Sequence, residues 1–387
     1  MRQEAVERYV AILSTSVYVD VAIPAGWRFR RGATGDYVTS CAICVYGPTQ
    51  WPHAFEFAAR TVSRDSRRLP NWRQTRSFFR VTRTSPVLIA VAALAACSLD
   101  PPNENTEVGP ADGEGSFGSF VWSGGLQRTY EIFVPPPTLE EVGALPLLIF
   151  YHGRASTGSA FENITGLDDI ALRERFVVVY PNGSGTEQSW AVGSGLTLAD
   201  QLFVNDVLFT NTLIDHISEE LSIDQSRVYV AGFSLGGMMT QTLACHLGNR
   251  IAAVLSVAAT PDPRFTQECF PDRVLPMMLI IGTEDPSYPL NGSSVTVSIR
   301  DMVDFWAGKL NCNINPVVEN LPDTEDDGTT VVRNTYDGCD LILYTIEGGG
   351  HTWPGSSVAF DPVFGLMSRE INASEVIVEF MLRHTLP

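Results

Sequence analysis

The chain has 387 residues, of which 44% are apolar, enough for one large domain with a sizeable core or for two small ones. Its formal charge of −18 is unevenly distributed: residues 1–97 contain 13 arginines and 6 acidic residues, so residues 98–387 carry a net charge of −25. Such an acidic main body argues against a nucleic acid or an anionic membrane surface as a partner.

The first 80 residues lack the pattern of a domain. They are rich in arginine, with scattered aromatic residues and no sustained period of 2 or 3.6. Cys41 and Cys44 form a single Cys-x-x-Cys without a second pair or a strand-helix frame, so we expect no metal and no redox role. We interpret residues 1–80 as a mis-assigned or disordered extension.

Residues 81–97 resemble the signal peptide of a bacterial lipoprotein. Arg80 and Arg83 precede an apolar run over 86–96, which is too short to span a bilayer but suits the core of a signal peptide. The run ends in Leu-Ala-Ala-Cys97, similar to the lipobox in which the cysteine is lipidated and becomes the new N-terminus. The alternative to a signal peptide is that this run forms a buried core helix.

These signals predict export. No methionine lies between Met1 and Met238, so a signal at this place requires an alternative start codon, for which Val81 is a candidate. Residues 98–118, rich in proline, asparagine and glycine, predict a flexible tether. We therefore expect a protein at the cell envelope or secreted, with membrane contact only through a lipid anchor at Cys97.

Residues 119–387 alternate short apolar strands with helices, which predicts one α/β domain with a mostly parallel, doubly wound sheet. Continuously apolar strands are typical of a parallel sheet that is covered on both faces. The expected strands are 119–122, 130–134, 147–151, 176–180, 228–230, 252–258, 274–281 and 341–346. The expected helices are 205–221, one directly after Ser234, 299–310 and 374–382.

The stretch from Gly232 to Gly236 is a G-x-S-x-G motif between an expected strand and an expected helix. In that context the motif is typical of a nucleophile elbow, a tight turn that exposes the hydroxyl of Ser234. The alternative is an ordinary strand-to-helix turn, because the pattern also occurs by chance. A catalytic role therefore requires an acid and a histidine elsewhere in the chain.

Both partners follow in the expected order. Asp285 comes just past the strand that ends at Ile281, and His351 lies in a glycine-rich loop after the last strand. The order serine, aspartate, histidine is that of α/β-hydrolases, with Glu284 as the competing acid. Four other histidines are assigned structural or surface roles: His152, His216, His246 and His384.

The chemistry of these residue types is complementary. An imidazole with a pKa near its usual value of about 6.5 can accept the serine proton and return it, and a carboxylate holds the imidazole in the required tautomer. An oxyanion needs two N–H donors, and we expect them at Leu235 and Arg154.

From Gln127 to the C-terminus the chain resembles the secreted polyhydroxybutyrate depolymerase/feruloyl esterase-like family, which are α/β-hydrolases that cleave esters. The motifs that carry the resemblance are Arg128-Thr-Tyr-Glu-Ile-Phe-Val-Pro135, Pro146-Leu-Leu-Ile-Phe-Tyr-His-Gly153, Asp206-Val207, Gly232-Phe-Ser-Leu-Gly-Gly-Met-Met, Gly282-Thr-Glu-Asp-Pro and Gly348-Gly-Gly-His-Thr-Trp-Pro-Gly355. The resemblance implies a triad of Ser234, Asp285 and His351, with no metal or other cofactor. The family usually continues with glycines after His-Gly, whereas here Arg154 follows.

The family pattern and proximity along the chain also favour two disulfides, Cys245–Cys269 and Cys312–Cys339. Four cysteines allow three pairings, and four free buried thiols are the alternative. An exported chain can keep its disulfides, which agrees with the signal at 81–97.

We expect an exported serine carboxylesterase, with feruloyl-type or acetyl esters of plant polysaccharide favoured over polyhydroxybutyrate or another polyester. Trp190 and Trp353 are expected to line the cleft and offer flat apolar surface to the substrate, with simple packing as the alternative. A serine peptidase remains open because the same triad cleaves amides. The rival from another class is a non-catalytic surface-binding protein on a hydrolase scaffold.

Overall fold

The computed structural model describes residues 6–13, 17–24, 55–63, 73–81, 117–137, 143–273 and 275–387. The chain divides into two units, 1–105 and 106–387. In the first unit β1 (Val6–Leu13) pairs antiparallel with β2 (Val17–Pro24), and β3 (Phe55–Ser63) pairs antiparallel with β4 (Arg73–Val81). The structure thus places strands where the sequence showed no sustained period. Cys41, Cys44, the lipobox Cys97 and tether residues 98–116 lie outside the described residues.

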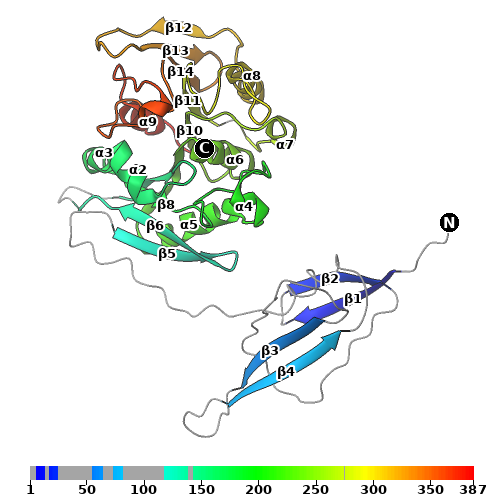
Figure 1. Ribbon diagram of the computed structural model, residues 1–387. Helices are drawn as coiled ribbons and strands as arrows, with labels where there is room; N and C mark the ends of the chain where they lie inside the picture. Colours follow the sequence, from blue (N-terminus) through cyan, green and yellow to red (C-terminus); the bar gives the residue numbers. More distant parts are fainter. Residues whose placement is uncertain are drawn as a thin grey trace, which may run out of the picture. The chain divides into compact units, whose positions relative to one another are not determined.

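The second unit is built on one ten-stranded sheet, which Figure 1 shows running from β12 at one end to β5 at the other. The order of its strands is β12 (Val317–Asn320), β13 (Thr330–Tyr336), β14 (Leu341–Glu347), β11 (Met277–Gly282), β10 (Ala253–Val257), β9 (Ile223–Phe233), β7 (Leu145–Tyr151), β8 (Val177–Pro181), β6 (Leu126–Phe133) and β5 (Phe117–Ser123). The six strands from β14 to β8 are parallel, and the pairs at both ends are antiparallel.

Helices cover both faces of the sheet because successive side chains of each buried strand point to opposite faces. Leu147 and Ile149 of β7 pack in one apolar cluster with α5, α6 and α8, whereas Leu148 and Phe150 pack in a second cluster with α2, α3 and α9. The predicted doubly wound α/β fold is therefore confirmed. The helices are α2 (Gly158–Thr165), α3 (Leu167–Glu174), α4 (Leu198–Gln201), α5 (Asp206–Glu220), α6 (Leu235–His246), α7 (Phe265–Glu268), α8 (Ile299–Lys309), the 3-10 turn η1 (Pro362–Phe364) and α9 (Ala373–Met381).

Besides the short elements α4, α7 and η1, two larger parts of the second unit were not predicted from the sequence. The first is the pair α2 and α3, eight residues each, in which Thr157 caps α2 by accepting a hydrogen bond from the Ala160 amide at 3.2 Å. The second is the antiparallel hairpin of β12 and β13, whose strand β12 is fully exposed and so carries little apolar pattern. Short or exposed elements of this kind give weak periodicity, because few of their residues enter the core.

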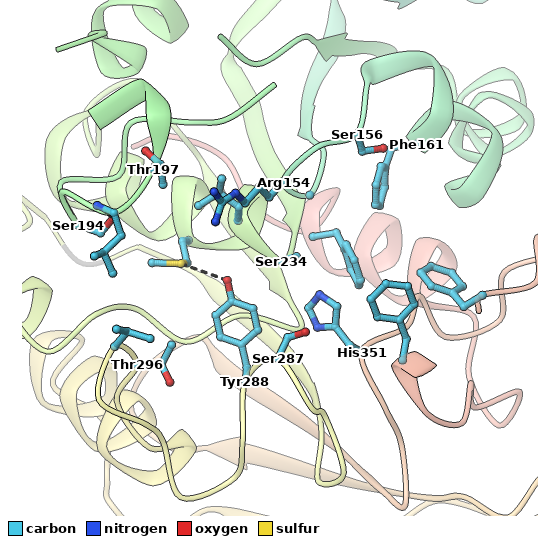
Figure 2. Close-up of a pocket in the computed structure, with 18 of the residues that line it drawn as sticks. Arg154, Ser156, Phe161, Ser194, Thr197, Ser234, Ser287, Tyr288, Thr296 and His351 are labelled. Carbon is cyan, nitrogen blue, oxygen red and sulfur yellow. Dashed lines mark hydrogen bonds between the residues drawn. The ribbon is translucent and has the colours of Figure 1, made fainter. Parts of the chain in front are cut away.

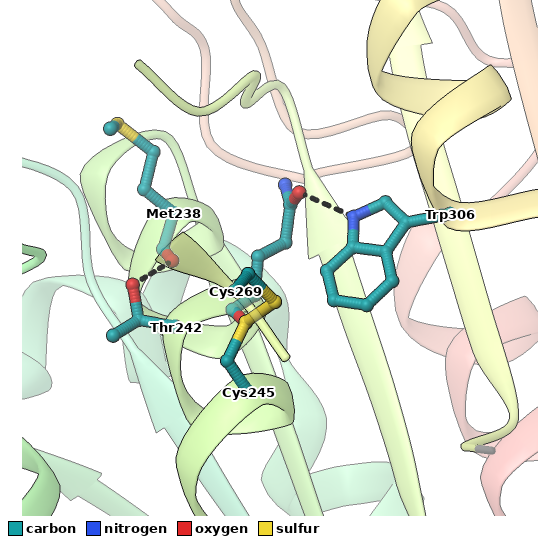
Figure 3. The surroundings of a disulfide bond; sticks show 6 residues. Met238, Thr242, Cys245, Cys269 and Trp306 are labelled. Carbon is teal, nitrogen blue, oxygen red and sulfur yellow. Dashed lines mark hydrogen bonds between the residues drawn. A yellow bond between two sulfur atoms is a disulfide. The ribbon is translucent and has the colours of Figure 1, made fainter. Parts of the chain in front are cut away.

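Two disulfides join Cys245 to Cys269 and Cys312 to Cys339, with Cα–Cα distances of 5.2 and 5.0 Å. These are the pairs that the family resemblance implied. Figure 3 shows the first, which ties the end of α6 to the segment after α7. Closing loops of this length stabilises a fold by about 3 kcal/mol each through the entropy of the unfolded chain. In the described ranges, no helix has the length and apolar character needed to cross a bilayer.

Candidate active site

Ser234 occupies a strained turn between β9 and α6. Its backbone has φ 56° and ψ −122°, a conformation that residues other than glycine rarely adopt and that is common at functional sites. The glycines on either side are needed for close approach: a Cβ at Gly232 would lie 2.3 Å from the Gly236 carbonyl oxygen, and one at Gly236 would lie 1.9 Å from the Tyr151 oxygen. This geometry is the tight strand-to-helix turn that the G-x-S-x-G spacing predicted.

His351 and Asp285 form a buried pair at the carboxyl ends of neighbouring strands. His351 Nδ1 lies 2.7 Å from Asp285 Oδ2, and the side chains are 6% and 1% exposed. The second oxygen, Oδ1, accepts the amides of Ser287 at 2.7 Å and Tyr288 at 2.8 Å, which fixes the carboxylate. Because Nδ1 faces the carboxylate, Nε2 remains for the serine proton. The competing acid, Glu284, is exposed.

Ser234 and His351 both line a cleft of about 560 Å³ (Figure 2). Its other lining residues are Gly153, Arg154, Ser156, Phe161, Ile164, Ser194, Leu196, Thr197, Phe233, Leu235, Met238, Ser287, Tyr288, Val295, Thr296, Phe360 and Phe364. Within the described residues, no direct hydrogen bond joins Ser234 Oγ to His351. Catalytic hydrogen bonds of this kind are often long without substrate and tighten when it binds.

The two expected oxyanion donors also face the cleft. Leu235 is the first residue of α6, so its amide has no acceptor within the helix. Arg154 lies in a turn that is closed by a hydrogen bond from the Ser156 amide to the Gly153 carbonyl oxygen at 3.2 Å, and no described residue accepts a hydrogen bond from the Arg154 amide. Its guanidinium forms an exposed ion pair with Glu187.

His152 precedes that turn and is fully buried. Its Nδ1 contacts the Gly153 carbonyl oxygen at 2.7 Å, and its Nε2 accepts the Gly183 amide at 3.0 Å. Burial lowers the pKa of His152 to about 4, so the ring is neutral at neutral pH. A neutral ring with both nitrogens occupied by backbone groups shapes the loop, as the sequence analysis expected.

The two tryptophans require a correction, because neither lines the cleft. Trp190 is 0% exposed and donates from Nε1 to the His152 carbonyl oxygen at 2.9 Å, and Trp353 is 1% exposed and donates to Ser374 Oγ at 3.1 Å. Both rings lie in the core, where their N–H groups need buried acceptors. Proximity along the chain brought the backbone of Trp353 to the site, but packing turned its ring away. Trp353 contacts Phe233, which does line the cleft, edge to face at 6.3 Å.

Aromatic residues that were not predicted from the sequence surround His351. Phe233 lies 4.7 Å from the His351 ring, Phe364 lies 6.0 Å from it, and Tyr288 stacks on it at 5.5 Å with an angle of 23°. Phe233 and Tyr288 could have been found, because the first precedes the predicted nucleophile and the second follows the predicted acid by three residues. Phe364 comes from η1 and carried no such signal.

A ten-stranded mostly parallel sheet, a strained serine between strand and helix, and a buried histidine-aspartate pair define an α/β-hydrolase. Comparison with known proteins agrees. The family model described as phospholipase/carboxylesterase matches residues 197–303. The chain therefore has the fold of an α/β-hydrolase and is similar to carboxylic ester hydrolases, as its motifs indicated.

The relatives extend the comparison along the chain. NocK of Nocardia uniformis subsp. tsuyamanensis, to which an esterase activity is ascribed, is 28% identical over 281 residues, 67% of this chain and 80% of NocK. Feruloyl esterase B of Piromyces equi is 30% identical over 231 residues, 56% of this chain and 41% of that protein. Poly(3-hydroxyalkanoate) depolymerase C of Paucimonas lemoignei is 30% identical over 237 residues, 54% of this chain and 55% of the relative. The match thus spans less than two thirds of the last two relatives.

Among solved structures, an acetyl xylan esterase from Aspergillus awamori superimposes with a TM-score of 0.47 at 16% identity, covering 61% of this chain and 94% of that one.

Proposed function

We propose that this protein is an exported serine carboxylesterase that hydrolyses carboxylic esters through an acyl-enzyme on Ser234. The observation that carries the proposal is the buried pair of His351 and Asp285, 2.7 Å apart, whose histidine lines the same cleft as the strained Ser234. Within the described residues, no group of three or more histidine, cysteine or acidic residues is arranged to hold a metal ion.

The residues have complementary parts in the reaction. Ser234 Oγ attacks the ester carbonyl carbon while His351 Nε2 takes the hydroxyl proton, and Asp285 stabilises the imidazolium that results. The amides of Leu235 and Arg154 donate hydrogen bonds to the oxyanion that forms. His351 then returns the proton to the alkoxy oxygen as the bond between the carbonyl carbon and that oxygen breaks. Water, activated by the same imidazole, releases the acid from Ser234.

The two sides of the cleft favour esters that join an aromatic or small acyl group to a sugar. Phe161, Phe233 and Phe360 form a connected set on one side, with ring distances of 5.3 and 5.9 Å, which suits a planar apolar group. Figure 2 shows Ser194 and Thr197 on the other side of Ser234 from Phe161, where hydroxyls can bind a polar alcohol. Among the relatives are feruloyl and acetylxylan esterases.

A polyester depolymerase is the second candidate. Leu196, Val295 and Phe364 line the cleft and are 53%, 46% and 37% exposed, so part of its mouth is apolar and accessible. Exposed apolar groups beside a cleft can contact an insoluble polymer. The relative from Paucimonas lemoignei carries the name of such an enzyme.

A substrate panel distinguishes these candidates. At equal concentrations of residues 98–387, methyl ferulate, an acetylated xylo-oligosaccharide, a polyhydroxybutyrate suspension and a feruloyl amide are compared, with Ser234→Ala as the blank. We expect turnover of at least one of the two small esters to exceed clearing of the polymer and cleavage of the amide. Rapid clearing with negligible turnover of both small esters would assign the enzyme to polyesters. Cleavage of the amide in preference to its ester would identify a peptidase, and no turnover at all would favour a binding protein.

Export and lipid anchoring at Cys97 form a separate part of the proposal. The support is the lipobox-like Leu-Ala-Ala-Cys97 together with two disulfides, which persist in oxidising compartments. Expressed from its own signal in a bacterium, the protein should fractionate with membranes and have a mass that begins at a lipidated Cys97. Cys97→Ala should release it from the membrane fraction or leave its signal uncleaved. A mature protein that retains residues 1–80 would contradict the assignment.

A further inference from the structure

Tyr288 is fixed beside the reacting groups by the same carboxylate that holds His351. Its amide donates to Asp285 Oδ1 at 2.8 Å, while Asp285 Oδ2 contacts His351 Nδ1 at 2.7 Å. Its ring stacks on the imidazole with centroids 5.5 Å apart and an angle of 23°. The side chain is half-buried and lines the cleft, as Figure 2 shows. Backbone and ring are therefore both placed with respect to the catalytic pair.

The hydroxyl of Tyr288 is a strong hydrogen-bond donor, but the acceptor that it contacts is weak. It donates to the thioether sulfur of Met238 at 3.3 Å, and a thioether accepts hydrogen bonds poorly. Burial raises the pKa of Tyr288 to about 12, so the hydroxyl keeps its proton at working pH, and it belongs to the same cleft as Ser234. An ester oxygen would be a better acceptor than the sulfur.

The neighbours of Tyr288 indicate which ester oxygen it would meet. The carbonyl oxygen already has two candidate donors, the amides of Leu235 and Arg154. Tyr288 instead covers a face of His351, the group that must protonate the departing oxygen. We propose that, when an ester binds, the Tyr288 hydroxyl donates its hydrogen bond to the alkoxy oxygen of the ester instead of to the sulfur of Met238. This hydrogen bond assists the departure of the alkoxy oxygen. This inference rests on the proposed esterase function.

The step is balanced without a change in Tyr288. In the tetrahedral intermediate the bond between the carbonyl carbon and the alkoxy oxygen breaks, and its electron pair stays on that oxygen. His351 Nε2–H supplies the proton, so the alcohol leaves neutral and the imidazole becomes neutral again. Tyr288 donates a hydrogen bond to the oxygen as negative charge develops and retains its own proton throughout. Its contribution should therefore increase with the basicity of the alcohol that leaves.

The test is Tyr288→Phe, which keeps the ring stacked on His351 and removes only the hydroxyl. kcat/KM is measured for acetates of p-nitrophenol, phenol, trifluoroethanol and ethanol, because this parameter reports acylation with a constant acyl group. We expect a loss of less than about tenfold for p-nitrophenyl acetate, rising to about 100-fold for ethyl acetate. Tyr336→Phe, the same change at a buried tyrosine of β13 outside the cleft, is the matched control and should leave all four values unchanged.

The outcomes separate this inference from the proposed function. An equal loss for all four acetates, or no loss, overturns the assignment, since a purely structural role would not change the dependence on the leaving group. The pH profile of kcat/KM below pH 9 should keep its shape in Tyr288→Phe, because the tyrosine stays protonated there. If the Ser234→Ala variant keeps the ester turnover of the wild type, the proposed function itself is overturned, and this inference with it.

Discussion

Ser234→Ala is expected to lower kcat/KM for ester hydrolysis by about 10³-fold or more, and His351→Ala by a similar amount. The physical reason is that the serine oxygen and the imidazole act in one step: without the base the hydroxyl keeps its proton, and without the hydroxyl the base has nothing to activate. The double variant should therefore be little worse than either single one, because members of such a unit are not additive. Initial rates on methyl ferulate or p-nitrophenyl acetate measure all three.

The control for this experiment is Ser159→Ala, the same change at an exposed residue of α2 outside the cleft. It should retain full activity, and all variants should show the circular dichroism and melting temperature of the wild type. Substantial ester turnover by a folded Ser234→Ala protein would contradict the assignment of Ser234 as the nucleophile.

Asp206→Ala is expected to destabilise the protein by about 3–5 kcal/mol, because it leaves the charge of Arg128 buried without a partner. Arg128 Nη1 lies 2.7 Å from Asp206 Oδ1, with side chains 4% and 0% exposed. The other carboxylate oxygen accepts the Ala191 amide at 2.7 Å, and the guanidinium lies 3.9 Å from the centre of the Phe209 ring. Urea unfolding followed by circular dichroism gives the free energy of unfolding.

Two further variants make that measurement specific. Arg128→Met combined with Asp206→Leu removes both charges and should be less destabilising than Asp206→Ala alone, because no unpaired charge remains. Asp304→Ala breaks the exposed pair with Arg300, whose side chains are 89% and 66% exposed, and should change the free energy of unfolding by less than about 1 kcal/mol. If Asp206→Ala unfolds like Asp304→Ala, the buried pair does not have the role that its burial indicates.

Asp206 also shows the difference between what a sequence motif predicts and what only the tertiary contacts reveal. The sequence pointed to Asp206 and Val207 only as residues before a long helix, and α5 does begin at Asp206. Its partner Arg128 lies in β6, 78 positions earlier in the chain, and belongs to a different motif of the family pattern. The packing of α5 on the sheet brings the two together, so no local pattern could have predicted the ion pair.

The positions of Ser234, Asp285 and His351 in the fold could be predicted because their determinants are local. A strand, a tight turn with two glycines and a helix are specified within about a dozen residues, and acids or histidines that follow parallel strands reach the same edge of the sheet. The strained φ of 56° at Ser234 and the close approach of Gly236 to Tyr151 are the tertiary form of that local pattern. The fold class followed in the same way from the alternation of apolar strands with helices.

Side-chain direction was decided by the tertiary structure. Trp353, two residues after His351, turned into the core to pack on Phe150 and donate to Ser374, whereas Tyr288, which drew no attention in the sequence, stacks on the imidazole. Chain proximity fixes where a backbone passes, but the free energy of burying a large ring fixes where the ring goes, and that depends on cavities built by distant segments. The sequence by itself therefore determined which residues can do the chemistry, and packing determined which residues surround them.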